Sequence, residues 1–114
     1  MSDRKIEEVT DMIDKIMEEK YPQTMKEMRS LIEYNFKVFK KKQSDYGPNN
    51  ILIHGDRRLS LLGIAIRSND KIQRILNLLG EDREPENESL EYSFLDLANY
   101  SYMACILMRK KWGK

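Results

Sequence analysis

The distribution of hydrophobic residues along the chain predicts four helices separated by short breaks. In the first of them, from Asp3 to Glu19, apolar side chains recur at steps of three and four residues, which places them on one helical face opposite a charged one. These apolar positions are Ile6, Val9, Ile13, Ile16 and Met17. Tyr21-Pro22 ends this helix, because the residue before a proline avoids the helical region of backbone space.

A second helix is expected from Thr24 to about Tyr46. Thr24 and Glu27 have the spacing of a capping box, in which each side chain accepts a hydrogen bond from a free backbone donor at the helix start. One stripe of this helix consists of Met28, Leu31, Ile32, Asn35, Phe36 and Phe39. The loop that follows, residues 47–57, contains three apolar residues at 51–53, which either cover the core or begin a short extended segment.

The third and fourth helices are expected at residues 59–79 and 88–110. Gly80 is the expected stop of the third helix, and Asn87 is the expected N-cap of the fourth. The apolar face predicted for the third helix consists of Leu61, Ala65, Ile72, Ile75, Leu76 and Leu79, and is widened by Leu62 and Ile66. The stripe predicted for the fourth helix consists of Phe94, Leu97, Ser101, Ala104, Cys105 and Met108.

These four amphipathic helices predict an all-α fold, an antiparallel four-helix bundle, because each apolar stripe must pack against another helix or a second chain. We expect residues 1–23 to form a separate N-terminal amphipathic helix that is used in oligomerisation. Residues 24–114 would form the helical domain. A symmetric homodimer is the default assembly, and a higher homo-oligomer is the alternative.

Composition excludes several classes of protein. The chain has 114 residues, a formal net charge of +1 and a single cysteine, Cys105, so an internal disulfide framework and a cysteine zinc site are excluded. A nearly neutral chain does not attract nucleic acid or a membrane surface by its overall field. No apolar run approaches the roughly 18 residues of a membrane span, and the N-terminus lacks the apolar core of a signal peptide. A cytoplasmic location is expected, with neither nucleic acid nor membrane as a partner.

The third helix carries a charged ridge beside its apolar face. Arg67, Asp70, Lys71 and Arg74 stand at positions i, i+3, i+4 and i+7. Such pairs stabilise a helix by only about 0.2–0.5 kcal/mol each, as a solvated and salt-bridged surface would. The alternative is an anion site, in which the three cations hold phosphates and Asp70 binds a metal ion or orients a base.

The fourth helix begins with acidic residues, among them Glu88 and Glu91, and continues with Asp96 inside an apolar run at 94–98. A carboxylate in such a run is expected to be partly buried, and a buried charge needs a partner. Asn99 and Tyr100, three and four residues further on, share its face. Asp96 therefore belongs either to a hydrogen-bond network in the core or, with the aspartate of the third helix, to a metal or ligand site.

The end of the second helix reads Asp45-Tyr46-Gly47. This segment is either a simple helix stop or the mouth of a cleft. In a cleft it would present a carboxylate, an aromatic plane on which a base can stack, and an unobstructed backbone.

Three segments together resemble a known family. They are Lys42-x-x-Asp45-Tyr46-Gly47, then Gly63-Ile64-x-x-Arg67-x-x-Asp70-Lys71-x-x-Arg74-x-x-x-Leu78-Leu79, and finally Glu88-Ser89-Leu90-x-x-x-x-Leu95-Asp96-Leu97-Ala98-Asn99-Tyr100. This ordered set resembles the nucleotide-modification-associated domain of phages and bacteria, which is similar to the MazG-like all-α nucleoside triphosphate pyrophosphohydrolases. The resemblance covers about residues 36–105.

The resemblance implies an oligomeric helical bundle that binds Mg²⁺ with paired acidic motifs on adjacent helices and cleaves a nucleotide between its α- and β-phosphates. It implies roles for nine residues: Asp70 and Asp96 as metal ligands, Glu88 or Glu91 orienting the water, Arg67, Lys71 and Arg74 facing phosphates, and Asp45 and Tyr46 bordering the base or sugar. We also expect Asn99 and Tyr100 to contact the substrate.

The sequence departs from the full MazG pattern of ExxE on one helix and ExxD on the next. The corresponding segments read Arg67-x-x-Asp70 and Ser93-x-x-Asp96, and fewer carboxylates weaken Mg²⁺ binding. Three functions stay open. The first is a Mg²⁺-dependent pyrophosphohydrolase that acts on a (deoxy)nucleoside triphosphate or a modified nucleotide. The second is a non-catalytic module that binds or sequesters a nucleotide, and the third is a structural helical bundle.

Overall fold

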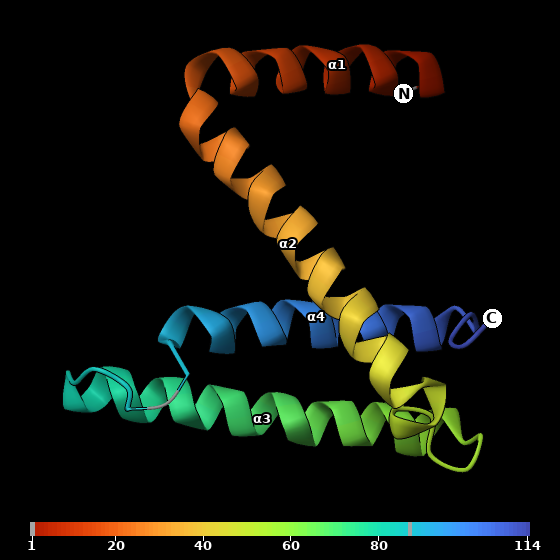
Figure 1. Ribbon diagram of the computed structural model, residues 1–114. Helices are drawn as coiled ribbons and strands as arrows, with labels where there is room; N and C mark the ends of the chain where they lie inside the picture. Colours follow the sequence, from red (N-terminus) through yellow and green to blue (C-terminus); the bar gives the residue numbers. More distant parts are fainter. Residues whose placement is uncertain (1, 87) are drawn as a thin grey trace. The chain divides into compact units, whose positions relative to one another are not determined.

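The computed structural model describes residues 2–86 and 88–114, and within these ranges the chain is all-α, as predicted. Its elements are α1 (Asp3–Lys20), α2 (Pro22–Tyr46), the 3-10 helix η1 (Pro48–Asn50), α3 (Arg57–Glu81) and α4 (Leu90–Met108) (Figure 1). No described helix combines the length and the apolar character that crossing a membrane requires.

The chain divides into two compact units, and the division falls inside α2. The first unit extends to Lys37, and the second covers Val38–Lys114. The boundary between residues 23 and 24 that the sequence suggests stays a prediction.

The N-terminal unit has an uncovered apolar face. Ser2 caps α1 by accepting a hydrogen bond from the backbone N–H of Lys5, and α1 contains no buried residue. Near the junction with α2, the guanidinium of Arg29 contacts both carboxylate oxygens of Glu18. The exposed apolar side chains of α1 are Ile6, Val9, Met12, Ile13 and Ile16. Since isolated short helices are marginally stable in water, this unit depends on packing against another surface.

The start of α2 differs from the expectation. This helix begins at Pro22, so Thr24 lies within its first turn and the predicted capping box is wrong. Proline suits the first helical position, because its ring presets the backbone angle and its missing N–H has no helical partner there. Tyr21 alone separates the two helices.

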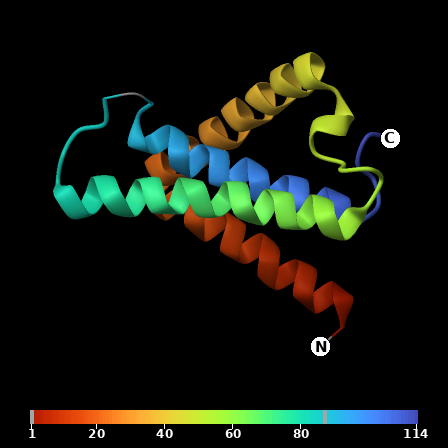
Figure 2. The ribbon, with the colours of Figure 1, turned by 90° about the horizontal axis from the view of Figure 1, so that it is seen from below.

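In the C-terminal unit, α3 and α4 lie side by side and run in opposite directions (Figures 1 and 2). The contacts between the two helices agree with these opposite directions. Ile64 near the start of α3 shares a core with Met103 of α4, whereas Arg74, further along α3, binds Ser93 near the start of α4. Ser60 and Ser93 are completely buried, and their small side chains occupy little space where the chain packs closely.

The ends of α3 lie outside the predicted range. Asp56 caps its start by accepting a hydrogen bond from Leu59 N at 3.0 Å. The helix continues through Gly80, the expected stop, and ends before Asp82, which adopts the left-handed conformation with φ 50° and ψ 47°. Aspartate tolerates this conformation better than most residues do, so a glycine is not required there.

The start of α4 is set by Ser89, whose hydroxyl accepts a hydrogen bond from Tyr92 N, so the helix begins at Leu90 and not at Glu88. The cap expected at Asn87 lies outside the described residues. The helix ends at Met108, two residues before the predicted end, and Lys110 has a φ of 58°.

The packed faces of α3 and α4 agree with the predicted ones only in part: Ile75 is buried as predicted, and Leu61 and Ala104 pack against the core. Among the residues that the structure describes, α3 buries Ser60, Ile64, Ile75 and Leu78, and α4 buries Ser93, Asn99, Met103 and Leu107. Of the predicted faces, Leu62, Ile66, Ile72, Leu76, Leu79, Phe94, Cys105 and Met108 are exposed. Both helices carry apolar residues on more than one side, so hydrophobic periodicity alone does not select the face that packs.

The core lies at the end of the unit where the loop after α2 meets the C-terminal tail. It consists of Ile51, Ile64, Met103, Leu107 and Trp112. Burial of Ile51, at 4% exposure, shows that the apolar segment 51–53 covers the core and does not begin a strand.

The tail is held by Trp112, whose indole Nε1–H donates a hydrogen bond to the Pro48 carbonyl at 3.0 Å. Its ring packs edge-on against Phe39, with centroids 6.0 Å apart and an interplanar angle of 76°. Gly113 has a φ of 72°, and a Cβ at this position would lie 3.0 Å from Cβ of Pro48. The tail therefore lies directly against η1 and holds the loop in place.

We predict that Trp112→Ala destabilises the protein by about 3–5 kcal/mol, because a large buried aromatic residue is lost and a cavity remains. Trp112→Phe should cost less, since it keeps a ring against Phe39 and loses the hydrogen bond to Pro48. Unfolding in urea measures both. Tyr102→Ala, at an exposed position of α4, is the control and should change stability by no more than about 0.5 kcal/mol. Equal losses in Trp112→Ala and Tyr102→Ala would contradict the role of the tail.

Candidate functional site

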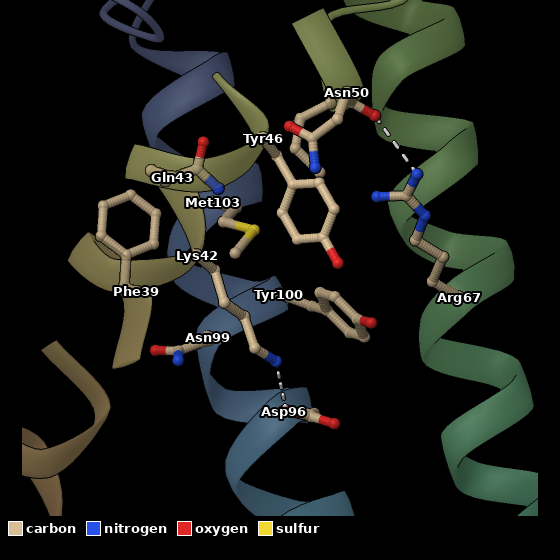
Figure 3. Close-up of a pocket in the computed structure, with 11 residues that line it drawn as sticks. Phe39, Lys42, Gln43, Tyr46, Asn50, Arg67, Asp96, Asn99, Tyr100 and Met103 are labelled. Atoms are coloured by element: carbon tan, nitrogen blue, oxygen red, sulfur yellow. Dashed lines mark hydrogen bonds and ion pairs between the residues drawn. The ribbon is translucent and has the colours of Figure 1, made fainter. Parts of the chain in front are cut away.

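A pocket of about 380 Å³ lies between four elements (Figure 3). It is lined by the last turns of α2, by η1, by the first half of α3 and by the middle of α4. All of its lining residues belong to the C-terminal unit. They combine three aromatic rings, three amides, three charged groups and two apolar side chains: Phe39, Tyr46 and Tyr100; Gln43, Asn50 and Asn99; Lys42, Arg67 and Asp96; Ile51 and Met103.

Asp96 is the centre of an ion-pair network at this pocket. Its Oδ2 lies 2.9 Å from Lys71 Nζ, and its Oδ1 lies 3.7 Å from Lys42 Nζ. Lys71 Nζ also lies 3.4 Å from Glu88 Oε2. The side chains of Asp96 and Lys71 are 20% and 22% exposed, so this contact is partly shielded from water. The network connects α2, α3, α4 and the connector before α4.

The hydrogen bond to Asp96 raises the pKa of Lys71 above its ordinary value of 10.5. Burial opposes this shift, while the negative charges of Asp96 and Glu88 reinforce it. Lys71 is therefore positively charged at neutral pH and fully available as the counter-ion of Asp96.

The other cations of the ridge have different partners. Arg74 donates hydrogen bonds to the hydroxyl of Ser93 and the backbone carbonyl of Glu88, so it anchors the start of α4. Arg67 reaches the pocket and donates to the backbone carbonyl of Asn50 at 3.2 Å. Of the three cations predicted to hold phosphates, Arg67 is the one that lines the pocket.

The predicted acidic residues are not gathered in one place. Asp70, Glu91 and Asp45 are exposed, and none of them lines the pocket that contains Asp96. Within residues 2–86 and 88–114, no group of three histidine, cysteine or acidic side chains is arranged to hold a metal ion. Asp96 is engaged by two ammonium groups, so this donor set does not fit Mg²⁺, which requires several oxygen ligands.

The pocket brings together five of the predicted site residues with groups that sequence reasoning missed. Tyr46, Arg67, Asn99 and Tyr100 line it as substrate-binding candidates, next to Asp96. The missed residues are Phe39, Lys42, Gln43, Asn50, Ile51 and Met103.

Helical spacing contained a signal for three of these missed residues. Phe39, Lys42 and Gln43 precede Tyr46 by seven, four and three residues and so share its helical face. Asn50 had no such signal, because it enters the pocket from a loop.

Asn50 has an unusual environment. Its side-chain Oδ1 is buried and accepts no hydrogen bond, although buried polar atoms in folded proteins nearly always have a partner. The amide lies at the same end of the pocket as Arg67 and Tyr46 (Figure 3). An unsatisfied amide beside an aromatic ring and a guanidinium is the arrangement expected where a polar ligand completes the hydrogen bonding.

No family model, curated protein or solved structure matches this chain. The resemblance to the nucleotide-modification-associated domain therefore stays a prediction.

The raised pKa of Lys71 leads to a prediction about stability and pH. A lysine whose pKa is higher in the folded state stabilises the protein fully below its unfolded pKa and loses this effect as the pH rises through the folded pKa. The difference in unfolding free energy between the wild type and Lys71→Met should be constant from neutral pH to about pH 10. Above pH 10.5 the wild type should lose stability relative to the variant. Parallel stability curves, measured by chemical denaturation over this range, would contradict the ion pair.

Proposed function

We propose that the C-terminal unit binds a nucleotide in the pocket between α2, α3 and α4. The observation that carries this proposal is the meeting of two tyrosine rings, a buried amide oxygen without a hydrogen-bond partner and an arginine in one cavity. This combination supplies a surface for a base, hydrogen-bonding groups for polar edges and a positive charge for a phosphate.

The aromatic groups provide the surface for a base. The rings of Tyr46 and Tyr100 project into the space between α4 and Arg67 (Figure 3). Stacking of a base on an aromatic side chain contributes about 1–3 kcal/mol and tolerates different bases. The side-chain oxygen of Asn50 adds an acceptor that can pair with a donor on a base or sugar edge.

The positive charge comes from Arg67, whose planar guanidinium can bind a phosphate through two hydrogen bonds. One bond to the Asn50 carbonyl orients the guanidinium, and the side chain is exposed enough to receive an anion. A ligand that stacks on the tyrosines would extend its phosphate toward this group.

The geometry supports binding better than hydrolysis. Mg²⁺-dependent cleavage between the α- and β-phosphates would need free carboxylates at the pocket, and Asp96, the carboxylate that lines it, is paired with Lys71 at 2.9 Å. Incubation of the protein with nucleoside triphosphates and Mg²⁺, with detection of pyrophosphate, tests the catalytic alternative. Turnover that is lost in Asp96→Asn would establish it.

We predict that Tyr46→Ala and Tyr100→Ala each weaken nucleotide binding by about tenfold or more, which corresponds to about 1.4 kcal/mol or more of lost stacking. A thermal-shift panel identifies the nucleotide, and calorimetric titration then measures its affinity. Tyr102→Ala is the matched control, because Tyr102 is an exposed tyrosine of α4 that does not line the pocket. Unchanged affinity in both pocket variants would refute the assignment of the pocket.

We also propose that a second copy of the chain covers the exposed apolar faces and completes a MazG-like antiparallel bundle. On α1 the apolar stripe is flanked by seven acidic and four basic side chains, so its charge is net negative. On α3 the uncovered apolar face belongs to a helix with five basic and two acidic side chains. Opposite charge on two uncovered apolar helices favours packing of α1 of one copy on α3 of the other.

Accordingly, Ile13→Lys should shift the protein from a dimer toward a monomer of 13.6 kDa in size-exclusion chromatography with light scattering, because it places a charge in the apolar stripe of α1. Glu7→Gln is the control, since it changes the net charge by the same amount on the polar face. A monomeric wild type with α1 protected from hydrogen exchange would show instead that α1 is covered within its own chain.

A further inference from the structure

We infer that the pocket selects a nucleoside monophosphate and binds it without a metal ion. This inference rests on the proposed nucleotide binding and specifies the ligand class of the same site. It follows from the ion pairs and hydrogen bonds that the cations around the pocket already form, from the net charge of the pocket lining and from the volume of the cavity.

Of the three cations of the charged ridge of α3 and the lining residue Lys42, two are committed to the fold. Lys71 is placed between the carboxylates of Asp96 and Glu88, at 2.9 Å and 3.4 Å. Arg74 is hydrogen-bonded to a side chain and a backbone carbonyl at the start of α4 and does not line the pocket. Recruiting either group for a longer phosphate chain would break contacts that hold α3 and α4 together.

The remaining two cations are Arg67 and Lys42. Arg67 makes one hydrogen bond, to a backbone carbonyl, and Lys42 lies 3.7 Å from Asp96 with its side chain 54% exposed. With Asp96 as the acidic lining residue, the charged lining is net positive by one. One phosphate, with a charge of about −1.5 to −2 at pH 7, suits this balance. Further phosphates would add negative charge close to Asp96 without another cation in the lining of this pocket.

The size of the cavity agrees with a ligand of this class. About 380 Å³ is near the lower end of the range of roughly 300–1,000 Å³ for small-molecule sites. Tyr46, Tyr100 and Asn50 lie on the side of the pocket nearest Arg67, and this part suits a base and a sugar (Figure 3). The charged lining provides for one anionic group next to the nucleoside.

The charge arrangement also removes the need for a metal ion. The ammonium of Lys71 lies between two carboxylates, Asp96 and Glu88, and forms an ion pair with each of them. An incoming phosphate then meets Arg67 directly, and no metal bridge is required between phosphate oxygens and carboxylates.

The experiment compares a nucleoside, its monophosphate and its triphosphate, each titrated calorimetrically into the full chain with EDTA and, separately, with Mg²⁺. We expect the monophosphate to bind at least about tenfold more tightly than the nucleoside, because a charge-assisted contact to arginine is gained. The triphosphate should bind no more tightly than the monophosphate, and Mg²⁺ should leave the monophosphate affinity unchanged.

Two arginine variants test the role of the phosphate contact. Arg67→Gln should bring the affinity for the monophosphate down to that for the nucleoside, while the nucleoside affinity stays within about twofold of wild type. The retained nucleoside affinity shows that the pocket is still folded. Arg58→Gln is the matched control, because Arg58 is an exposed arginine of α3 that does not line the pocket, and it should behave as wild type.

The possible failures are distinguishable. A triphosphate that binds more than about tenfold tighter than the monophosphate, or binding that requires Mg²⁺, overturns this inference and leaves nucleotide binding intact. Equal affinity for nucleoside and monophosphate in the wild type overturns the phosphate contact alone. Absence of binding by all three compounds, for every base tested, overturns the proposed function together with this inference.

Discussion

The arrangement of the C-terminal unit depends on one partly buried carboxylate, that of Asp96. A charge that is withdrawn from water requires a partner, and Asp96 has two, Lys71 on α3 and Lys42 on α2. Because the two lysines approach different oxygens, the carboxylate joins three helices at a single point. Sliding α3 along α4 by one helical turn would separate these charges, so the contact favours the observed register of the helices.

The same contact determines what the pocket can do. It uses the cation that the sequence pattern suggests for a phosphate, Lys71, and it occupies the carboxylate suggested for a metal ion. What remains for a ligand is the aromatic and amide part of the cavity, with Arg67 beside it. The C-terminal tail also contacts the pocket lining. Trp112 donates a hydrogen bond to the Pro48 carbonyl and packs against Phe39, which itself lines the pocket.

The apolar surfaces of the chain are distributed unequally. The core of the C-terminal unit contains the buried apolar residues near the loop and the tail, whereas α1 and the outer face of α3 remain uncovered. Large contiguous apolar surfaces are uncommon on monomeric proteins, because exposing them to water costs free energy. The pocket is built entirely within the C-terminal unit.

The amino-acid sequence determined the local features: four helices, the charged ridge of α3, and a partly buried Asp96 with Asn99 and Tyr100 on its face. These follow from periodicity and from the cost of burying a charge, which depend on residues close together in the chain. Tertiary structure alone decided which faces of α3 and α4 meet, which lysines pair with Asp96, and that Asn50 enters the pocket. Those choices join groups far apart in the sequence, and helices that are apolar on several sides leave them open until the chain folds.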